Sequence, residues 1–284
     1  MKIIITSDSV CDLPNELLEK NQIDILPITI TLGDKEYVNS TELTPNDIFE
    51  FVKKTKILPK TSAINEYQYT EFFESRLAED VAIIHFVISS DISSCYNNAV
   101  SAAKKLQNVY IIDSKNLSTG VGLQVLYACA LRDSGLSAVE IVEKVEARKN
   151  KVQTSFVVER LDYLHKGGRC SSVQLLGANL LKIRPSIKLA DGKMGMHKKY
   201  RGKMPEVIKD YCNDTLTEFS NYDNEVCFLT FSSATPEMIE AAKDVLKSKA
   251  NFKNIYLSTA GCTVTSHCGE NTLGILYLQK ADVE

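Results

Sequence analysis

Residues 81–88, Val-Ala-Ile-Ile-His-Phe-Val-Ile, form an apolar, β-branched run of strand length. A polar segment, Ser89-Ser90-Asp91-Ile92-Ser93-Ser94-Cys95, follows at once, and the residues up to Leu106 then have apolar side chains at helix spacing. A buried strand that turns into a helix through serines brings hydroxyls and unpaired N–H groups to one point, which favours an anion there. We interpret that anion as a carboxylate on a long apolar tail. The alternative is that Ser93 or Ser94 only caps the helix.

The rest of the first half repeats this alternation of strand and helix. Strands are predicted at Ile3–Ile5, Asp24–Leu32 and Val109–Ile112, and helices after Pro14, after Thr44, after Asn65, over 118–132 and after Ser137, with Lys60–Asn65 as a short polar hinge. Alternation of this kind predicts a parallel sheet with helices on its faces, in a domain that covers residues 1–153. Three polar turns, Ser7–Ser9, Ser89–Ser94 and Asp113–Ser118, should then meet beyond the carboxyl ends of the strands, where such sheets bind ligands.

The second half, residues 154–284, changes character and is predicted to be an α+β domain with a mixed or antiparallel sheet. A hairpin with an Asp191-Gly192 turn is expected between Ile183 and Tyr200. Further strands are predicted at Phe156–Val158, Asn224–Phe231, Asn254–Leu257, Thr263–Ser266 and Leu273–Leu278, helices at Leu161–Leu164, from Pro205 and from Thr235, and a flexible basic loop at Lys166–Arg169.

Composition places the chain among globular proteins, with 44% apolar and 24% charged residues. No apolar run approaches the roughly 20 residues of a membrane span. The acid at Asp8 comes too early for a signal peptide. Eight cysteines without a Cys-x-x-Cys spacing indicate neither a disulfide framework nor a metal site. We therefore expect a reduced, cytoplasmic protein with at most transient membrane contact.

Positive charge is concentrated between Lys166 and Lys203, where ten Lys or Arg residues accompany one acid, Asp191. This asymmetry suggests an anionic partner, either an acidic protein face or a phosphate group, or a nucleic acid; a solvated face is the alternative. Nucleic-acid readers usually also carry aromatic stacking platforms, and only Tyr200 is aromatic in this segment. We expect a protein partner and no nucleic acid.

Several kinds of catalytic machinery are missing from the sequence. There is no phosphate-binding loop and no nucleophile elbow, and Val125 stands where a dinucleotide fingerprint needs its third glycine. The remaining candidates are Thr61-Ser62, Ser93-Ser94 and His267, which together could surround a small anion as hydrogen-bond donors. A Ser/His esterase built on the same residues would need a carboxylate to orient the histidine, and the sequence nominates none. The other histidines, at 85, 165 and 197, have no partner at metal-ligand spacing.

Six short motifs follow one another along the chain: Asp8-Ser9 with Asp12-Leu13-Pro14, Lys60-Thr61-Ser62, Ser89-Ser90-x-x-Ser93, Asp113-Ser114, Leu164-x-Lys166-Gly167-Gly168-Arg169-x-Ser171 and Thr265-x-His267-x-Gly269. The fifth is the most specific of them. Together, and in this order, they resemble the DegV family of bacterial fatty-acid-binding proteins over essentially the whole chain.

The resemblance implies two α/β-type domains with one long-chain fatty acid buried between them, and no metal or other cofactor. It implies that Thr61, Ser93 and His267 hold the carboxylate, with Ser62 and Ser94 adjacent. It further implies that a separate ATP-dependent fatty acid kinase receives the bound acid, with Arg169 and Arg201 near the docking face. A lipid carrier or sensor without a kinase is the alternative.

Three turns depart from the family pattern near the expected carboxylate. Ser94-Cys95 stand where Gly-Thr is usual, Ala63-Ile64 replace a segment that contains proline, and Gly269-Glu270-Asn271 replace a Gly-Pro-Gly turn. Because glycine allows a close backbone approach, these changes bear on the geometry of the site.

Overall fold

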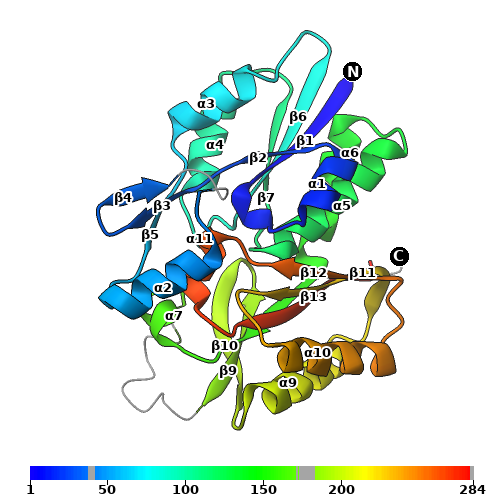
Figure 1. Cartoon of the computed structure of the whole chain (residues 1–284). Helices are drawn as coiled ribbons and strands as arrows, with labels where there is room; N and C mark the ends of the chain where they lie inside the picture. Colours follow the sequence, from blue (N-terminus) through cyan, green and yellow to red (C-terminus); the bar gives the residue numbers. More distant parts are fainter. Residues whose placement is uncertain (38–41, 171, 173–182, 282–284) are drawn as a thin grey trace.

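A computed structural model describes residues 1–37, 42–170, 172 and 183–281. Ser171 and Lys182, which belong to the predicted family motif and the basic segment, lie outside this part of the chain. The described residues form three sheets with helices around them (Figure 1).

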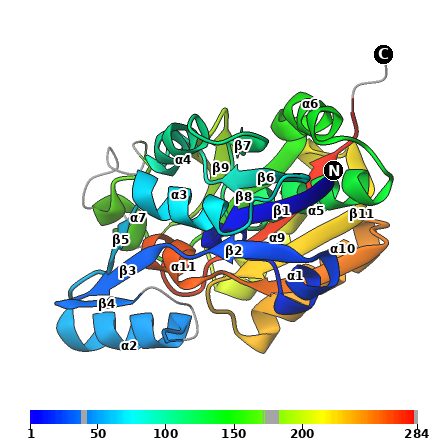
Figure 2. The same cartoon turned by 90° about the horizontal axis from the view of Figure 1, so that it is seen from above.

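The first sheet is parallel, with the strand order β2-β1-β6-β7, as the alternation of strands and helices predicts. Its strands are β1 (Lys2–Asp8), β2 (Ile23–Leu26), β6 (Val81–Val87) and β7 (Val109–Asp113). Helices α3 (Glu66–Glu74) and α4 (Cys95–Ala103) cover one face, and α1 (Asn15–Asn21), α5 (Thr119–Asp133) and α6 (Ala138–Arg148) cover the other (Figure 2).

Strand β6 explains why residues 81–88 are apolar without interruption. Val81, Ile83 and Val87 pack in the core under α3 and α4. Ala82, Ile84 and Phe86 point the other way and pack against α5 and α6. Since successive side chains of a strand face opposite sides, a strand with helices on both faces has no solvent side.

The second sheet is mixed and has the order β10-β9-β8-β13-β11-β12, in which only β11 and β12 run parallel. Its strands are β8 (Val152–Val157), β9 (Arg184–Ala190), β10 (Lys193–Tyr200), β11 (Tyr222–Phe231), β12 (Asn254–Thr259) and β13 (Leu273–Gln279). Helices α9 (Met204–Glu218) and α10 (Pro236–Lys249) cover its outer face, away from the first sheet (Figure 1). On the inner face Phe228 and Leu276 join the core of α5 and the first sheet.

The chain thus forms the two-domain α/β fold that the sequence predicts, with a mixed second sheet. The β9–β10 hairpin turns at Asp191 and Gly192, which both have positive φ as an Asp-Gly turn requires. The predicted domain boundary at residue 153 falls inside β8, and the division there stays a prediction.

A small antiparallel sheet, β4-β3-β5, refines one expectation and corrects another. It contains β3 (Thr29–Leu32), β4 (Lys35–Tyr37) and β5 (Lys60–Ser62), with α2 (Pro45–Thr55) beside it. The β-rich run predicted over Asp24–Leu32 forms two strands, β2 at the edge of the first sheet and β3 in the small sheet. The chain leaves the first sheet at Pro27, which has no N–H to give to a strand partner. The hinge predicted at Lys60–Asn65 is wrong, since its first three residues pair with β3.

The strand predicted at Thr263–Ser266 is a helix, α11 (Cys262–Cys268). The β-branched run Thr263-Val264-Thr265 favours a strand on propensity alone. In the fold, Thr265 and Ser266 instead donate their hydroxyls to the carbonyls of Ala260 and Cys262, which satisfies groups within the turn. Helix α11 also packs against α2 and α7, so tertiary contacts override propensity here.

Helix α7 (Asp162–Gly167) replaces part of the predicted flexible basic loop, since Lys166 and Gly167 complete its last turn. Two 3-10 turns, η1 (Ser9–Cys11) and η2 (Lys149–Lys151), complete the described elements. The eight cysteines are all buried and carry free thiols. In the described part of the chain, no helix has the length and apolarity needed to cross a membrane.

Candidate functional site

A cavity of about 540 Å³ lies where the carboxyl edge of the first sheet meets the inner face of the second sheet. Its walls come from the loop after β6, from β5, α7 and α11, and from β8, β10, β11 and β13. Much of the lining is apolar and includes Ile88, Leu117, Phe156, Leu164, Val264 and Leu276. A cavity of this size and character suits an apolar ligand rather than a bare ion.

The three predicted polar turns lie at one edge of the first sheet, because β1, β6 and β7 are parallel neighbours. The turns after β6 and β7 reach the cavity through Ser90, Ser93, Ser94 and Ser118. The Ser7–Ser9 turn does not line it: Ser7 donates to the carbonyl of Phe86, and Ser9 accepts from the amide of Ile28.

Two of the predicted carboxylate-binding residues meet directly at the cavity wall. Thr61 comes from β5 and His267 from α11, and Oγ1 of Thr61 lies 2.9 Å from Nε2 of His267. The hydrogen bond joins positions 206 residues apart, and both side chains line the cavity. A hydroxyl and an imidazole at one point can donate hydrogen bonds to an acid head group.

Ser93, Ser62 and Ser94 line the same cavity. Ser93 donates to Sγ of Cys95 at 3.2 Å and accepts from the amide of Cys95 at 3.3 Å, so it supports the start of α4 while facing the cavity. Ser94 occupies the N-cap position but makes no side-chain capping bond. Within the described residues, no side-chain capping bond forms at the N-cap of α4, and the hydroxyl of Ser93, one residue before it, bonds only Cys95. The part of Ser93 in holding a ligand stays a prediction.

His267 carries no charge near neutral pH. Burial and, after it, the positive charge of Arg169 lower the pKa of His267 to about 4. The ring therefore has one N–H to donate at physiological pH. The hydroxyls and this neutral ring are uncharged hydrogen-bonding groups on the cavity wall.

Arg169 and Arg201 are both exposed. Arg169 also lines the cavity, and its Nη1 donates to the carbonyl of Gly167 at 2.6 Å. Arg201 directly follows β10. The basic segment is less positive in space than in sequence, because acids of α9 and of nearby loops pair with it, as in Lys188–Glu218, Lys198–Asp214, Lys193–Asp91 and Arg184–Glu159.

His85 lies in the core of the first domain, on β6. It is fully buried, its Nδ1 lies 2.7 Å from Oγ1 of Thr6, and its Nε2 lies 3.1 Å from Oδ1 of Asp8. Tyr69 donates to the same carboxylate oxygen at 2.8 Å. Among the described residues no group of three or more His, Cys, Asp or Glu side chains could hold a metal ion.

Asp12 holds the amino end of α11, a role that the sequence does not reveal beyond its place in a family motif. Its carboxylate accepts from the hydroxyl of Ser118 at 2.5 Å and from the amide of Gly261 at 2.9 Å. Ser258 donates to its carbonyl. One buried side chain thus ties the first domain to the helix that carries His267.

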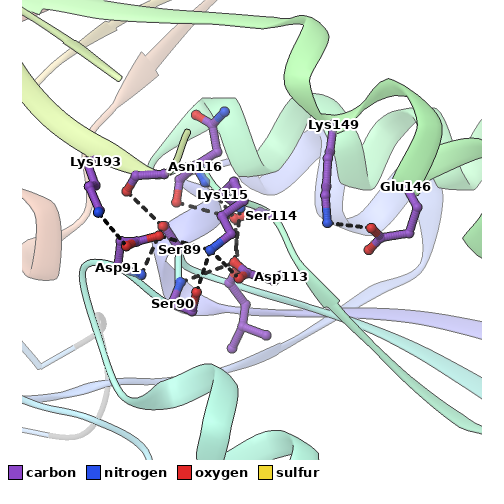
Figure 3. Close-up of polar contacts among 12 residues, drawn as sticks. Ser89, Ser90, Asp91, Asp113, Ser114, Lys115, Asn116, Glu146, Lys149 and Lys193 are labelled. Atoms are coloured by element: carbon purple, nitrogen blue, oxygen red, sulfur yellow. Dashed lines mark hydrogen bonds and ion pairs between the residues drawn. The ribbon is translucent and has the colours of Figure 1, made fainter. Parts of the chain in front are cut away.

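Lys115 clamps the loop that carries Ser93 and Ser94 (Figure 3). Its Nζ lies 2.7 Å from Oγ of Ser90, 2.9 Å from Oδ2 of Asp91 and 3.1 Å from Oδ2 of Asp113. From the other side, Ser89 donates to the carbonyl of Gly192 at 2.8 Å, so the tip of the β9–β10 hairpin also rests on this loop. The loop is therefore held by both domains.

We expect Lys115→Met to lower the melting temperature by a few degrees at neutral pH, because three oxygens lose their cation. The Lys115 ammonium lowers the pKa of Asp91; burial alone would raise the pKa of Asp113, but hydrogen bonds from Ser90 and Lys115 lower it. A carboxyl group whose pKa is lower in the folded protein than in the unfolded chain stabilises the fold at pH values above its ordinary pKa. This stabilisation is lost as the pH falls through the lowered pKa of the folded state. The difference in melting temperature between wild type and variant should therefore disappear at acidic pH.

Thermal melts at several pH values measure this difference. Lys149→Met is the matched control, because Lys149 pairs with Glu146, away from the loop (Figure 3). An equal fall in melting temperature in both variants would show that Lys115 makes no particular contribution to the stability of the loop.

The fold and this site define a class: a two-domain α/β protein with an interior apolar cavity that ends in hydroxyls and an imidazole. A family model described as "Uncharacterised protein, DegV family" matches residues 2–280. The chain belongs to the DegV family, as its motifs predict.

Relatives and solved structures agree with this assignment. DegV domain-containing proteins of Clostridium acetobutylicum and Clostridium perfringens are 30% and 29% identical, over 98% of this chain and 99% and 97% of theirs. A fatty-acid-binding DegV family protein of Thermus thermophilus has the same fold, with a TM-score of 0.91 at 23% identity over 99% of this chain and all of that one.

Two solved relatives are nearer in sequence. A stearic-acid-binding protein of Eubacterium ventriosum is 25% identical, covers 99% of both chains and has a TM-score of 0.86. DegV of Bacillus subtilis, a fatty-acid-binding protein, is 27% identical over 99% of this chain and 100% of that chain, with a TM-score of 0.82. These three solved relatives thus bind fatty acids.

Proposed function

We propose that this chain binds one long-chain fatty acid in the cavity between its domains. Thr61 and Ser93 hold the carboxylate directly, His267 holds it through its hydrogen bond to Thr61, and Ser62 and Ser94 lie beside it. The observation that carries the proposal is the contact of Thr61 with His267 on the wall of a mostly apolar cavity. Solved relatives that bind fatty acids support it.

The tail supplies most of the affinity. Burying roughly 14 methylenes at about 0.8 kcal/mol each yields a gross term on the order of 11 kcal/mol. The entropy lost on association and on ordering the tail removes several kcal/mol of this gross term. The polar wall adds hydrogen bonds from neutral donors to the charged carboxylate, roughly 1.5–3 kcal/mol each, and so mainly fixes the orientation of the acid.

We further propose that the protein presents this acid to a separate ATP-dependent fatty acid kinase in the cytoplasm, which forms an acyl phosphate. Exposed Arg169 at the cavity wall and exposed Arg201 at the end of β10 support a docking face for an acidic or phosphate-bearing partner. The uncharged hydroxyls and imidazole suit this role, because neutral donors leave the carboxylate oxygen nucleophilic.

The geometry does not favour a Ser/His esterase. Such an enzyme needs a third group to orient the histidine, and Nδ1 of His267 has no hydrogen-bond partner in the part of the chain that the structure describes.

We expect Ser93→Ala and His267→Ala to weaken stearate binding by roughly ten- to a hundredfold without abolishing it. Ser93→Ala removes one hydrogen bond to the charged carboxylate, and His267→Ala removes the hydrogen bond that orients Thr61. Acyl phosphate formation by a fatty acid kinase should fall further, since it needs the carboxylate in one orientation. A binding titration and a kinase assay with the same variants measure the two effects. Ser134→Ala and His165→Ala, on exposed positions, are the controls. Loss of stearate with intact phosphorylation would contradict this division of roles.

A further inference from the structure

Two consecutive glycines end α7, and the structure gives them different tasks. Gly168 lies in the left-handed region, with φ of +71°, so its backbone conformation calls for glycine. Gly167 is in the last turn of the helix, where an ordinary residue could sit. Its lack of a side chain therefore needs another reason.

That reason is the imidazole of His267. A Cβ on Gly167 would lie 2.8 Å from Nδ1 of His267 and within 4 Å of two ring carbons, Cε1 and Cγ. Contacts under 3.0 Å are essentially never seen for a Cβ. The backbone of α7 thus lies flat against the edge of the ring, and any side chain at Gly167 would push the ring toward the cavity.

The same contact determines which ring nitrogen carries the proton. Nδ1 is buried against Gly167 and has no hydrogen-bond partner among the described residues, whereas Nε2 lies 2.9 Å from Oγ1 of Thr61. A buried N–H without an acceptor is disfavoured more than a buried lone pair without a donor. The proton of the neutral ring therefore belongs on Nε2, where it can be donated to Thr61.

Arg169 stabilises the contact between Gly167 and His267. Its Nη1 donates to the carbonyl of Gly167 at 2.6 Å, which fixes the peptide that presses on the ring. Its positive charge, together with burial, also disfavours a second proton on the ring.

We propose that Gly167 is a positioning residue for His267: the bare backbone at this position holds the imidazole as the Nε2–H tautomer, which leaves the Thr61 hydroxyl to donate its own proton to a ligand carboxylate. The direction of this hydrogen-bond chain toward a carboxylate rests on the proposed function. The tautomer itself belongs to the protein without a ligand.

The test is nitrogen NMR of the full chain with ¹⁵N-labelled histidine, without lipid, with the His267 signals assigned from His267→Ala. Wild type should show protonated Nε2 and unprotonated Nδ1. Gly167→Ala should shift or broaden these signals and weaken stearate binding about tenfold. Gly195→Ala is the matched control, because a Cβ there meets nothing within 4 Å, and it should change neither result.

A second comparison separates positioning from a general loss of fold. In a His267→Ala background the clashing ring is gone, so Gly167→Ala should cost no more than Gly195→Ala in stability or stearate affinity. A proton on Nδ1 in wild type, an unchanged His267 spectrum in Gly167→Ala, or a double variant that does not fold would each overturn the proposal. If wild type shows the expected tautomer but binds no stearate, the proposed function fails while the role of Gly167 in holding the ring stands.

Discussion

Val264→Phe should reduce stearate affinity by about a hundredfold or more. Val264 lies on α11 and lines the cavity, and it is only half-buried because its side chain faces that space. A phenyl ring there would occupy the room of about four methylenes, and at about 0.8 kcal/mol each their exclusion costs about 3 kcal/mol. Displacement titration of the delipidated variant measures the loss.

The matched control is Val139→Phe, because Val139 is 50% exposed on α6 and far from the cavity wall. This variant should bind stearate as wild type does. Unchanged binding by Val264→Phe, with its fold intact by circular dichroism, would show that the tail does not occupy this cavity.

Asp12→Asn should remove a strong pH dependence of stability. Burial raises the pKa of Asp12 to about 7, from an ordinary value of 3.8, against the opposing effect of hydrogen bonds from Ser118 and Gly261. Between these two pH values the folded protein holds a proton that the unfolded chain has released. Stability from this group is therefore greatest at low pH and falls as pH rises toward 7.

The expected size follows from the shift of about three pKa units at about 1.4 kcal/mol each, on the order of 4 kcal/mol. Wild type should lose this much unfolding free energy relative to Asp12→Asn between about pH 4 and pH 7. Urea unfolding of both proteins across this range measures it, and other titrating groups cancel in the difference. A constant difference would show that Asp12 is not a buried, proton-binding link between the domains.

Local signals in the sequence predict much of this fold. The strand over 81–88, the hairpin turn Asp191-Gly192 and the helix after Ser137 all form as predicted, and a capping box of Ser137 and Glu140 begins that helix. In each case the determining contacts lie within a few residues, so spacing and residue type are enough. The meeting of two polar turns at the cavity follows from the parallel order of β6 and β7.

The rest depends on contacts between distant segments. The segment with Thr263 and Val264 favours a strand by propensity, yet α11 forms because both domains pack around it. Thr61 likewise lies on a strand because β3 pairs with it. Family resemblance, rather than local pattern, is what brings Thr61 and His267 together in the sequence-based prediction. The roles of Asp12 and Gly167 appear only in three dimensions, because each acts on a segment about 100 or more residues away.

Native mass spectrometry of the protein purified without added lipid tests the central claim most directly. The account predicts a second species heavier than the bare chain by the mass of one long-chain fatty acid, and the loss of this species in Val264→Phe but not in Val139→Phe. A chain that carries no such passenger, and that takes up none when delipidated protein is mixed with stearate, would contradict it.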